Sequence, residues 1–516
     1  MRSQDGTGRG SVWAGLFSNS ALALVCRVVT ALSAFCIIPF IISRLGIAGY
    51  GVWETLIALG GILFVLQNII SNTLLWWMSQ AYGRGDHETL YRSAGIGLGS
   101  LGLFFLVTVP AVWLAREPLT LFINVPAAEV PEVARLLAIY VAVYVAGGVN
   151  EILAAMVTAS QRMGEALVFQ TAGRLMNYGC AIGLLLAGHG MGSLVAGSAI
   201  GSVVYGALLV RTLRRLYPGI RFRPLFPSRR EIAELYRYTG FMFIISVVAA
   251  MREQADKIIL AAFASPTWVG YYGIALRLAS LLLEFNRFFF QPLIAASGAL
   301  QARGDRDGVC ILYRRVVLSV AVCTGMVFIG VMGGYDRIMS FWLGSSAIPQ
   351  VTEMLLLLVL GNFFAVILAG PQTSICRGIG RAGVETVYVL FRLLLDLALT
   401  VLLVTLIGAM GTVYATAASR IVGTLLFTWL FHHTLQMPVR WVMSAVGVFA
   451  VALLLAGVTR GVFSLLAFPV SRGESLLSFS IVVLPACGLY LWALVLSGIV
   501  TREEIMSMMS LGHRKG

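Results

Sequence analysis

Fourteen apolar runs, each about as long as a membrane-spanning helix, follow one another along this 516-residue chain. A helix of about twenty apolar residues crosses the hydrocarbon core of a bilayer. The runs do not alternate with the period of two that marks a transmembrane strand, and backbone groups in lipid must be paired internally, so we predict helices. The expected spans are roughly 17–43, 52–76, 94–114, 133–157, 167–187, 193–210, 238–262, 270–295, 315–334, 351–376, 386–408, 412–432, 441–467 and 477–499.

The composition agrees with an all-α polytopic membrane protein. Only 12% of the residues are charged and the mean hydropathy is +0.89, whereas a soluble domain carries about 25% charged residues. A net charge of +14 would favour nucleic acid in a soluble protein, but here the basic residues follow the membrane topology. The seven cysteines include no Cys-x-x-Cys motif, so neither a disulfide framework nor a zinc site is indicated. We expect no metal, no cofactor and no nucleic-acid partner.

A basic segment at 211–237 divides the chain. It holds eight arginines against two glutamates and is the longest polar interruption between apolar runs. Basic loops remain in the cytoplasm. We therefore expect an N-terminal six-helix lobe at 1–210, a basic cytoplasmic linker at 211–237, a C-terminal six-helix lobe at 238–435, and two extra helices with a cytoplasmic tail at 436–516.

The remaining basic residues predict the orientation. If the N-terminus is inside, the cytoplasmic segments carry 23 lysines and arginines, the external loops six and the spans eight. This asymmetry favours a multi-pass protein of the plasma (inner) membrane with both termini in the cytoplasm. No small-residue cleavage site follows the first apolar run, so we expect a retained first span.

The two halves repeat at offsets of 218 to 222 residues. Six spans separate the copies, and because this number is even the copies run parallel and are related by an axis along the membrane normal. Two pseudo-symmetric lobes that face one cavity are typical of transporters. The matched segments are Tyr50-Gly51 with Tyr272-Gly273, Arg84-Gly85-Asp86 with Arg303-Gly304-Asp305, and Arg174 with Arg392.

Several charges fall inside the spans, where each needs a partner or a water-filled cavity. Guanidinium groups match phosphate oxygens, so one interpretation is that four arginines line a cavity and bind an anionic head group: Arg27, Arg252, Arg277 and Arg287. The alternative is salt bridging along or between helices. It is favoured for the pairs with i,i+4 spacing, which are Arg252/Asp256, Glu253/Lys257 and Arg392/Asp396. The adjacent His432 and His433 end a span and are interpreted as interfacial.

Short motifs resemble those of the polysaccharide exporter family, the O-antigen and exopolysaccharide flippases of the multidrug/oligosaccharidyl-lipid/polysaccharide (MOP) exporter superfamily. The resemblance covers about residues 12–500. It rests on Asp256-Lys257-Ile258-Ile259-Leu260, on Val269-Gly270-Tyr271-Tyr272, on Arg303-Gly304-Asp305, and on the Arg174 and Arg392 spans that end in Gly192 and Gly411.

The resemblance implies a fold like that of the multidrug and toxic compound extrusion (MATE) proteins, with two six-helix lobes around a central cavity and two C-terminal helices. It implies a flippase, not an enzyme, that carries an undecaprenyl-diphosphate-linked oligosaccharide from the inner to the outer leaflet by alternating access. Such a protein would work beside a polymerase and glycosyltransferases in O-antigen, capsule or exopolysaccharide biosynthesis. A counter-ion, H⁺ or Na⁺, is possible, and Asp256, Glu284 and Asp396 are the candidate coupling acids.

Three alternatives stay open. A lipid II flippase also has basic cavity residues and extra C-terminal helices. A cation-coupled multidrug exporter would share the fold, but it would be expected to bind organic cations through carboxylates. An O-antigen polymerase or ligase normally carries a large external loop, and the longest external stretch expected here is 115–132.

Overall fold

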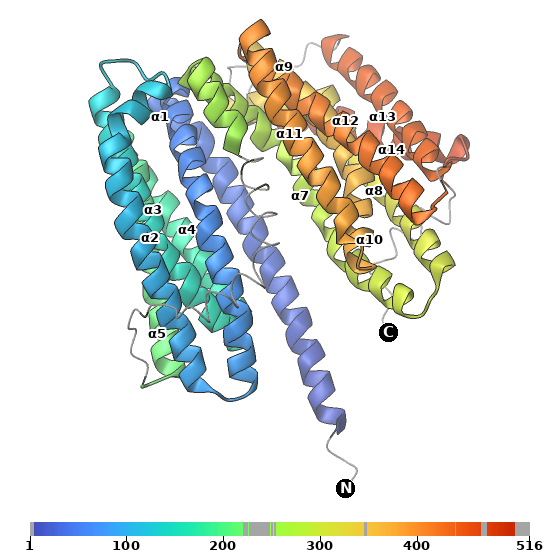
Figure 1. Ribbon diagram of the computed structural model, residues 1–516. Helices are drawn as coiled ribbons and strands as arrows, with labels where there is room; N and C mark the ends of the chain where they lie inside the picture. Colours follow the sequence, from blue (N-terminus) through green and yellow to red (C-terminus); the bar gives the residue numbers. More distant parts are fainter. Residues whose placement is uncertain are drawn as a thin grey trace. The chain divides into compact units, whose positions relative to one another are not determined.

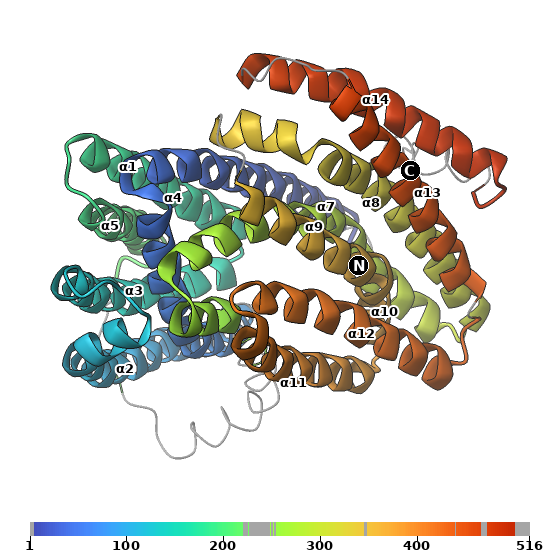
Figure 2. The ribbon, with the colours of Figure 1, turned by 90° about the horizontal axis from the view of Figure 1, so that it is seen from above.

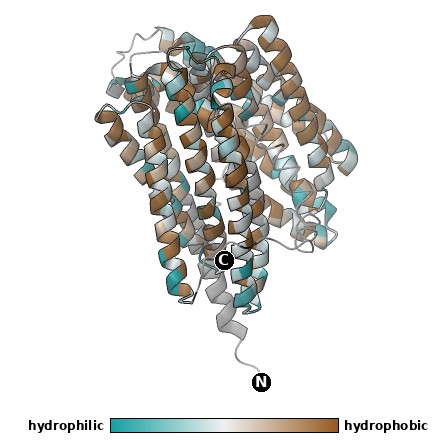
Figure 3. Cartoon of the chain, turned by 60° about the vertical axis from the view of Figure 1, so that its left-hand side comes forward, coloured by the Kyte–Doolittle hydropathy of each residue, from teal (hydrophilic) through white to brown (hydrophobic). Residues whose placement is uncertain are grey.

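The computed structural model describes residues 5–219, 254–344, 348–438, 440–465 and 472–500, together with Leu225, Val248 and Met251. These residues form helices joined by short turns, and the ranges contain no strand. Ten of the described helices are long and apolar enough to cross a membrane. Most residues along the helices are apolar, and hydrophilic residues are more frequent toward many helix ends (Figure 3). The predicted all-α membrane fold is therefore confirmed, although the structure does not establish fourteen as the number of spans.

By their internal packing the residues form two compact units, 1–270 and 271–516. The first contains α1 (Asp5–Gly83), α2 (His87–Phe122), α3 (Val130–Ala159), α4 (Met163–Leu186) and α5 (Gly192–Leu216) (Figure 1). Helix α7 (Pro266–Ala302) begins in the first unit and continues in the second. The second also contains α8 (Arg306–Leu343), α9 (Pro349–Phe364), η1 (Ala365–Ala369), α10 (Gly370–Gly378), α11 (Ala382–Ile407), α12 (Met410–Leu435), α13 (Arg440–Leu465) and α14 (Arg472–Leu496).

Helix α1 contains the first two predicted spans and bends between them at Gly46. This residue has φ 72° and ψ 175°, a left-handed conformation that glycine adopts without a steric penalty. Within the same unit α3 packs on α1 and α2, and α4 packs along α5. Helix α2 continues through Pro118 to Phe122, so the first part of the stretch expected to be external, 115–132, is helical.

The described part of the predicted span at 238–262 packs with the first unit. Residues 254–263 are helical. Asn124, which follows the end of α2 and has a left-handed φ of 52°, donates its side-chain amide to the carbonyl oxygens of Ala261 at 3.2 Å and Ala262 at 2.6 Å. The boundary between packing units at Gly270 therefore lies after this span, whereas the expected sequence boundary is the basic linker before it. Most of the linker and residues 238–247 lie outside the described residues.

In the second unit α13 and α14 pack against α8, and α11 packs along α12 (Figures 1 and 2). Helix α9 passes into α10 through a π-helical turn, η1. The turn ends at Ala369, two residues before Pro371, which has no backbone N–H to continue the ordinary i→i−4 ladder. A single π turn inside an α-helix is a recognised way to absorb such an irregularity and is frequent at functional sites.

The internal repeat is visible in the turns. Left-handed residues recur at Gly85 and Gly304, which are 219 residues apart, and at Gln161 and Gly380, which are also 219 apart. The next helix in each half starts in the same way, because the side chain of Asp86 accepts from the Thr89 N–H at 3.0 Å and that of Asp305 accepts from the Gly308 N–H at 2.8 Å. Aspartate is a strong N-cap residue, so equivalent local sequences produce equivalent helix starts.

Candidate functional site

A charged cluster lies inside the first unit and joins α1 to the helical segment 254–263. The Lys257 Nζ donates to Glu54 Oε2 at 2.7 Å, and the Tyr50 hydroxyl donates to Glu54 Oε1 at 2.7 Å. The two charged side chains are only 11% and 15% exposed. We call Tyr50, Glu54 and Lys257 the Glu54 cluster. Both oxygens of the carboxylate are hydrogen-bonded, which is the arrangement a buried ionised group requires.

The surroundings of the Glu54 cluster are tightly packed. Trp53 stacks edge-on against Tyr140 of α3, with ring centroids 5.2 Å apart. Asp256, beside Lys257 in the sequence, is also buried. At Gly51 the α1 backbone meets the start of α7, and a β-carbon there would stand 1.7 Å from the Pro266 carbonyl oxygen. The residues that position the cluster are therefore held by direct contact between backbones.

Lys257 has a partner outside its own helix, because the ammonium is bonded to Glu54. Glu253, the expected i,i+4 partner, lies outside the described residues, so that pair stays a prediction. The sequence analysis did not single out Glu54. The available signal was that Glu54 is the one carboxylate in the apolar run 52–76, and an acid at that depth requires a partner.

The four arginines predicted to bind a head group are described unevenly. Arg27 on α1 and Arg277 on α7 are exposed, and neither forms a side-chain hydrogen bond or ion pair with another described residue. Arg252 lies outside the described residues, and so does the side chain of Arg287. Arg27 belongs to the first unit and Arg277 to the second, so a common arginine site stays a prediction.

Only two of the three candidate coupling acids have described side chains. Asp256 and Asp396 are buried, whereas the side chain of Glu284 lies outside the described residues. Asp396 accepts a hydrogen bond of 2.6 Å from the Ser419 hydroxyl on α12. The expected i,i+4 pair with Arg392 was wrong for this conformation, because Arg392 Nη1 donates to the Tyr388 hydroxyl at 3.3 Å and no ion pair joins it to Asp396.

A second polar network crosses the second unit. Gln372 of α10 donates to the Tyr313 hydroxyl at 3.0 Å and to the Thr428 hydroxyl at 3.2 Å. Tyr313 also contacts His432 Nε2 at 3.3 Å, and His432 Nδ1 lies 3.0 Å from the Met437 carbonyl oxygen. His432 is buried in this network, in the last turn of α12, so its side chain is enclosed by protein. Its neighbour His433 is exposed.

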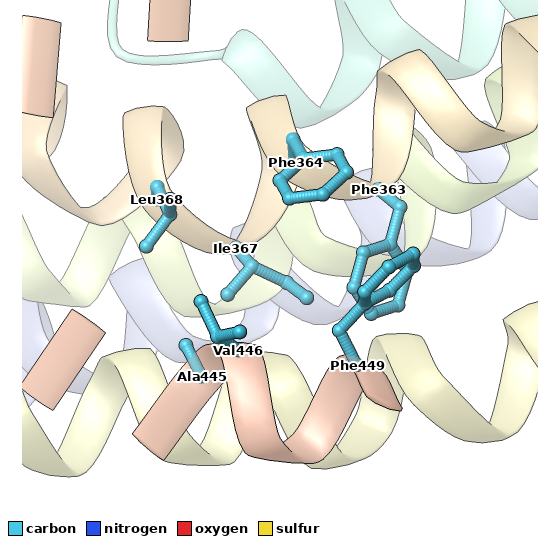
Figure 4. Close-up of a pocket in the computed structure, with 7 residues that line it drawn as sticks. All are labelled: Phe363, Phe364, Ile367, Leu368, Ala445, Val446 and Phe449. Carbon is cyan, nitrogen blue, oxygen red and sulfur yellow. The ribbon is translucent and has the colours of Figure 1, made fainter. Parts of the chain in front are cut away.

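An apolar groove lies between the π-helical turn and the appended helix α13 (Figure 4). The groove is shallow: its empty volume of about 230 Å³ includes the open space at its mouth, and the enclosed part, about 10 Å³, is the size of one water molecule. Ile367 of η1 faces Val446 and Phe449 of α13 across it, and the rings of Phe363 and Phe449 lie against each other. Phe364, Leu368 and Ala445 complete the lining. The groove offers hydrocarbon contacts, and all the described side chains that line it are apolar.

Comparison with known families assigns the chain to a family. Residues 16–296, more than half of its length, match the sequence model of the family described as "Polysaccharide biosynthesis protein". The chain belongs to this family. The match includes α1 to α5, the basic linker, the Glu54 cluster and most of α7.

The fold of this family member is that of the MOP exporters. It is similar to a structure described as "Lipid II flippase MurJ, inward closed conformation", with a TM-score of 0.71 and 13% identity over 94% of this chain and 100% of the other. It is also similar to an inward-facing MATE family transporter of the MOP superfamily, with a TM-score of 0.63 and 14% identity over 80% of this chain and 98% of the other.

A curated relative is similar in sequence. "Probable multidrug resistance protein NorM" of Rhizobium meliloti (strain 1021) is 25% identical over 263 residues, which are 48% of this chain and 54% of the relative. The chain thus spans about half the length of this curated relative. Together, the family match and the ten candidate spans identify a multi-pass membrane protein of the polysaccharide biosynthesis family, whose fold is similar to that of solved MOP transporters. No group of three or more His, Cys, Asp or Glu side chains suited to a metal ion occurs among the described residues.

Proposed function

We propose that this family member is a flippase that carries undecaprenyl-diphosphate-linked oligosaccharide repeat units across the inner membrane by alternating access. The observation that carries the proposal is the match of residues 16–296 to the polysaccharide biosynthesis family. The product would serve O-antigen, capsule or exopolysaccharide assembly beside a polymerase and glycosyltransferases. Both termini would lie in the cytoplasm, as the asymmetry of basic residues favours.

The unpaired arginines support an anionic substrate. Arg27 and Arg277 fall within apolar helices and are exposed without a side-chain partner among the described residues. A diphosphate supplies the oxygens that such guanidinium groups bind. A membrane potential that is negative inside would favour outward movement of the anion by about 2.3 kcal/mol per charge per 100 mV.

The apolar groove supports a substrate with a long hydrocarbon tail. In this proposal the groove between η1 and α13 receives part of the polyisoprenoid chain, while the sugars and diphosphate occupy the central cavity that the family resemblance implies. Each buried CH₂ contributes about 0.8 kcal/mol, so even a short stretch of tail adds substantially to affinity. The appended helices would then serve in substrate binding.

A lipid II flippase is the second candidate, because its fold gives the TM-score of 0.71. Lipid II also combines a polyisoprenoid, a diphosphate and sugars, so the features above fit it equally. A cation-coupled drug exporter is favoured by the sequence likeness to the Rhizobium relative, but the unpaired intramembrane arginines disfavour an organic cation. If transport is coupled to H⁺ or Na⁺, the buried Asp256 and Asp396 and the acid Glu284 are the proposed sites.

Complementation tests the proposal. Arg27, Arg252, Arg277 and Arg287 are changed singly to Ala and to Lys in cells that lack the endogenous flippase, with surface polysaccharide and lipid-linked intermediate scored at equal protein levels. We expect Ala to block export while the intermediate accumulates, and Lys to restore export in part. Normal export by all four Ala variants would remove the arginine site. Rescue of lipid II transport, without rescue of surface polysaccharide, would favour the second candidate.

A further inference from the structure

The ion pair of the Glu54 cluster links the two sequence repeats. Glu54 follows Tyr50-Gly51 of the first repeat, whereas Lys257 precedes the matching Tyr272-Gly273 of the second. The two residues nevertheless meet at 2.7 Å inside one packing unit. Any rearrangement that moves the first-repeat part of this unit against residues 254–263 must therefore stretch or break the pair.

Glu54 and Lys257 differ in the hydrogen bonds that each would keep if the pair separated. If the pair separates, Glu54 still accepts the hydrogen bond from Tyr50 at 2.7 Å. Among the described residues Lys257 has no comparable second partner, because Glu54 is its one hydrogen-bond acceptor there. An ammonium carries three donor protons, so two of them have no acceptor from these residues. A largely buried cation of this kind needs a replacement anion before it can leave its partner.

Two close contacts between backbones lie beside the Glu54–Lys257 pair. A β-carbon at Gly51 would stand 1.7 Å from the Pro266 carbonyl oxygen, and one at Gly270 would stand 2.6 Å from the Ile47 carbonyl oxygen. These backbones touch without intervening side chains, so any separation at this point moves the two backbones themselves apart. Three residues beyond Gly51, the Glu54–Lys257 pair is the strong link across the same contact.

We infer that Lys257 is an anion-binding residue. Glu54 is its partner in this structure, and a phosphate or diphosphate group replaces Glu54 during transport. The inference rests on the proposed function for the identity of the anion, which would be the diphosphate of the lipid-linked substrate. Binding of the anion and opening of the contact at Gly51 are then one event, because the same ammonium serves both. A neutral lipid supplies no such replacement and leaves the pair closed.

Affinity measurements on the purified full-length chain, in nanodiscs of neutral phospholipid, test this inference. Isothermal titration calorimetry compares farnesyl diphosphate, inorganic pyrophosphate and farnesol as probes. The variants are Glu54→Gln, which keeps the Tyr50 hydrogen bond but removes the competing charge, Lys257→Met, and the double variant. The matched control is Glu165→Gln, because Arg162 and Glu165 also form a 2.7 Å pair but are 47% and 40% exposed.

We expect Glu54→Gln to bind farnesyl diphosphate about tenfold more tightly than wild type, a change equivalent to about 1.4 kcal/mol. Lys257→Met and the double variant should bind it at least about tenfold more weakly than Glu54→Gln. Farnesol should bind all variants alike, and the control should match wild type. Equal affinity of Glu54→Gln and the double variant for farnesyl diphosphate would overturn the inference. The double variant buries no unpaired charge, so this comparison remains valid if Lys257→Met does not fold.

The probes also separate this inference from the proposed function. Binding of farnesyl diphosphate through Lys257 without binding of pyrophosphate supports a lipid-linked anion. Equal binding of pyrophosphate through Lys257 overturns the lipid-linked source and assigns a free anion. If Lys257 governs farnesyl diphosphate binding but the chain does not export lipid-linked oligosaccharide in the complementation assay, the proposed function fails and the anion site stands.

Discussion

The hydroxyl of Tyr490 on α14 lies directly over Gly325 of α8, 2.0 Å from the position that a β-carbon at residue 325 would occupy. Tyr490 is fully buried. A similar contact recurs two turns along α8, where a β-carbon at Gly333 would stand 2.7 Å from the Thr459 side chain on α13. Small residues that allow close approach are typical of helix contacts in membranes. Helices α13 and α14 therefore pack directly against glycines of α8.

The first prediction concerns the contact between Gly325 and Tyr490. Changing Gly325 to Ala should lower the free energy of unfolding by about 1 to 3 kcal/mol, because the methyl group overpacks the contact with Tyr490. Thermal unfolding of the detergent-solubilised protein measures the effect. Gly488→Ala on α14 is the control, since no atom lies within 4 Å of a β-carbon at that position. The control should be neutral or stabilising by up to about 1 kcal/mol, and equal losses for both variants would contradict the prediction.

The second prediction concerns the stability of the Glu54 cluster. Lys257→Met should cost about 3 to 5 kcal/mol of unfolding free energy, because it leaves a buried carboxylate without its cation. Arg162→Met breaks an exposed pair of the same length and should cost about 0 to 1 kcal/mol. Adding Glu54→Gln to Lys257→Met should recover most of the loss. Chemical denaturation of the four proteins gives these values, and failure of the double variant to recover would mean that packing, not charge, accounts for the cost.

The third prediction addresses the apolar groove. Val446 lines it and Leu453 does not, although the two α13 side chains are similarly exposed, at 44% and 47%. Val446→Trp should fill the groove and reduce export, while Leu453→Trp should leave export near wild type. Surface polysaccharide measured at matched protein levels reads out the difference. If both variants export normally, the groove does not receive the tail.

The fourth prediction concerns pH. Hydrogen bonds from the side chain and backbone of Thr89 lower the pKa of Asp86 below its ordinary value of 3.8. A carboxyl with a depressed folded-state pKa stabilises the fold above the unfolded-state value, and this contribution disappears as the pH falls through the folded-state value. The stability difference between wild type and Asp86→Ala should therefore be constant from pH 7 to about pH 5 and shrink below about pH 4. Thermal unfolding across this range checks it, and a difference that grows with acidity would have the wrong sign.

Local patterns predicted much of the fold. The apolar runs predicted the described helices, and the paired Arg-Gly-Asp segments predicted equivalent turns, because a left-handed glycine followed by an aspartate cap acts within a few residues. The family resemblance also came from short local motifs and is confirmed by the family match. The π-helical turn was not predicted, although Pro371 marks its position.

Partners of charged side chains were harder to predict. Arg392 and Asp396 have the spacing of an intrahelical pair, yet Arg392 bonds to Tyr388 and Asp396 to Ser419. The i,i+4 spacing brings side chains near one another, but competing partners also lie within reach, one turn earlier on α11 for Arg392 and on α12 for Asp396. The arginine site stays a prediction, because the described residues include the side chains of only Arg27 and Arg277 among its four members.

The sequence by itself determined that this is a helical membrane protein with an internal repeat, since span length, hydropathy and turn chemistry act over short distances. Only the tertiary structure decided that Lys257 meets Glu54, 203 residues away in the chain, and that α13 and α14 lie against the glycines of α8. The physical reason is that a buried charge or a bare stretch of backbone needs some partner, while its identity depends on which helix surfaces fit together.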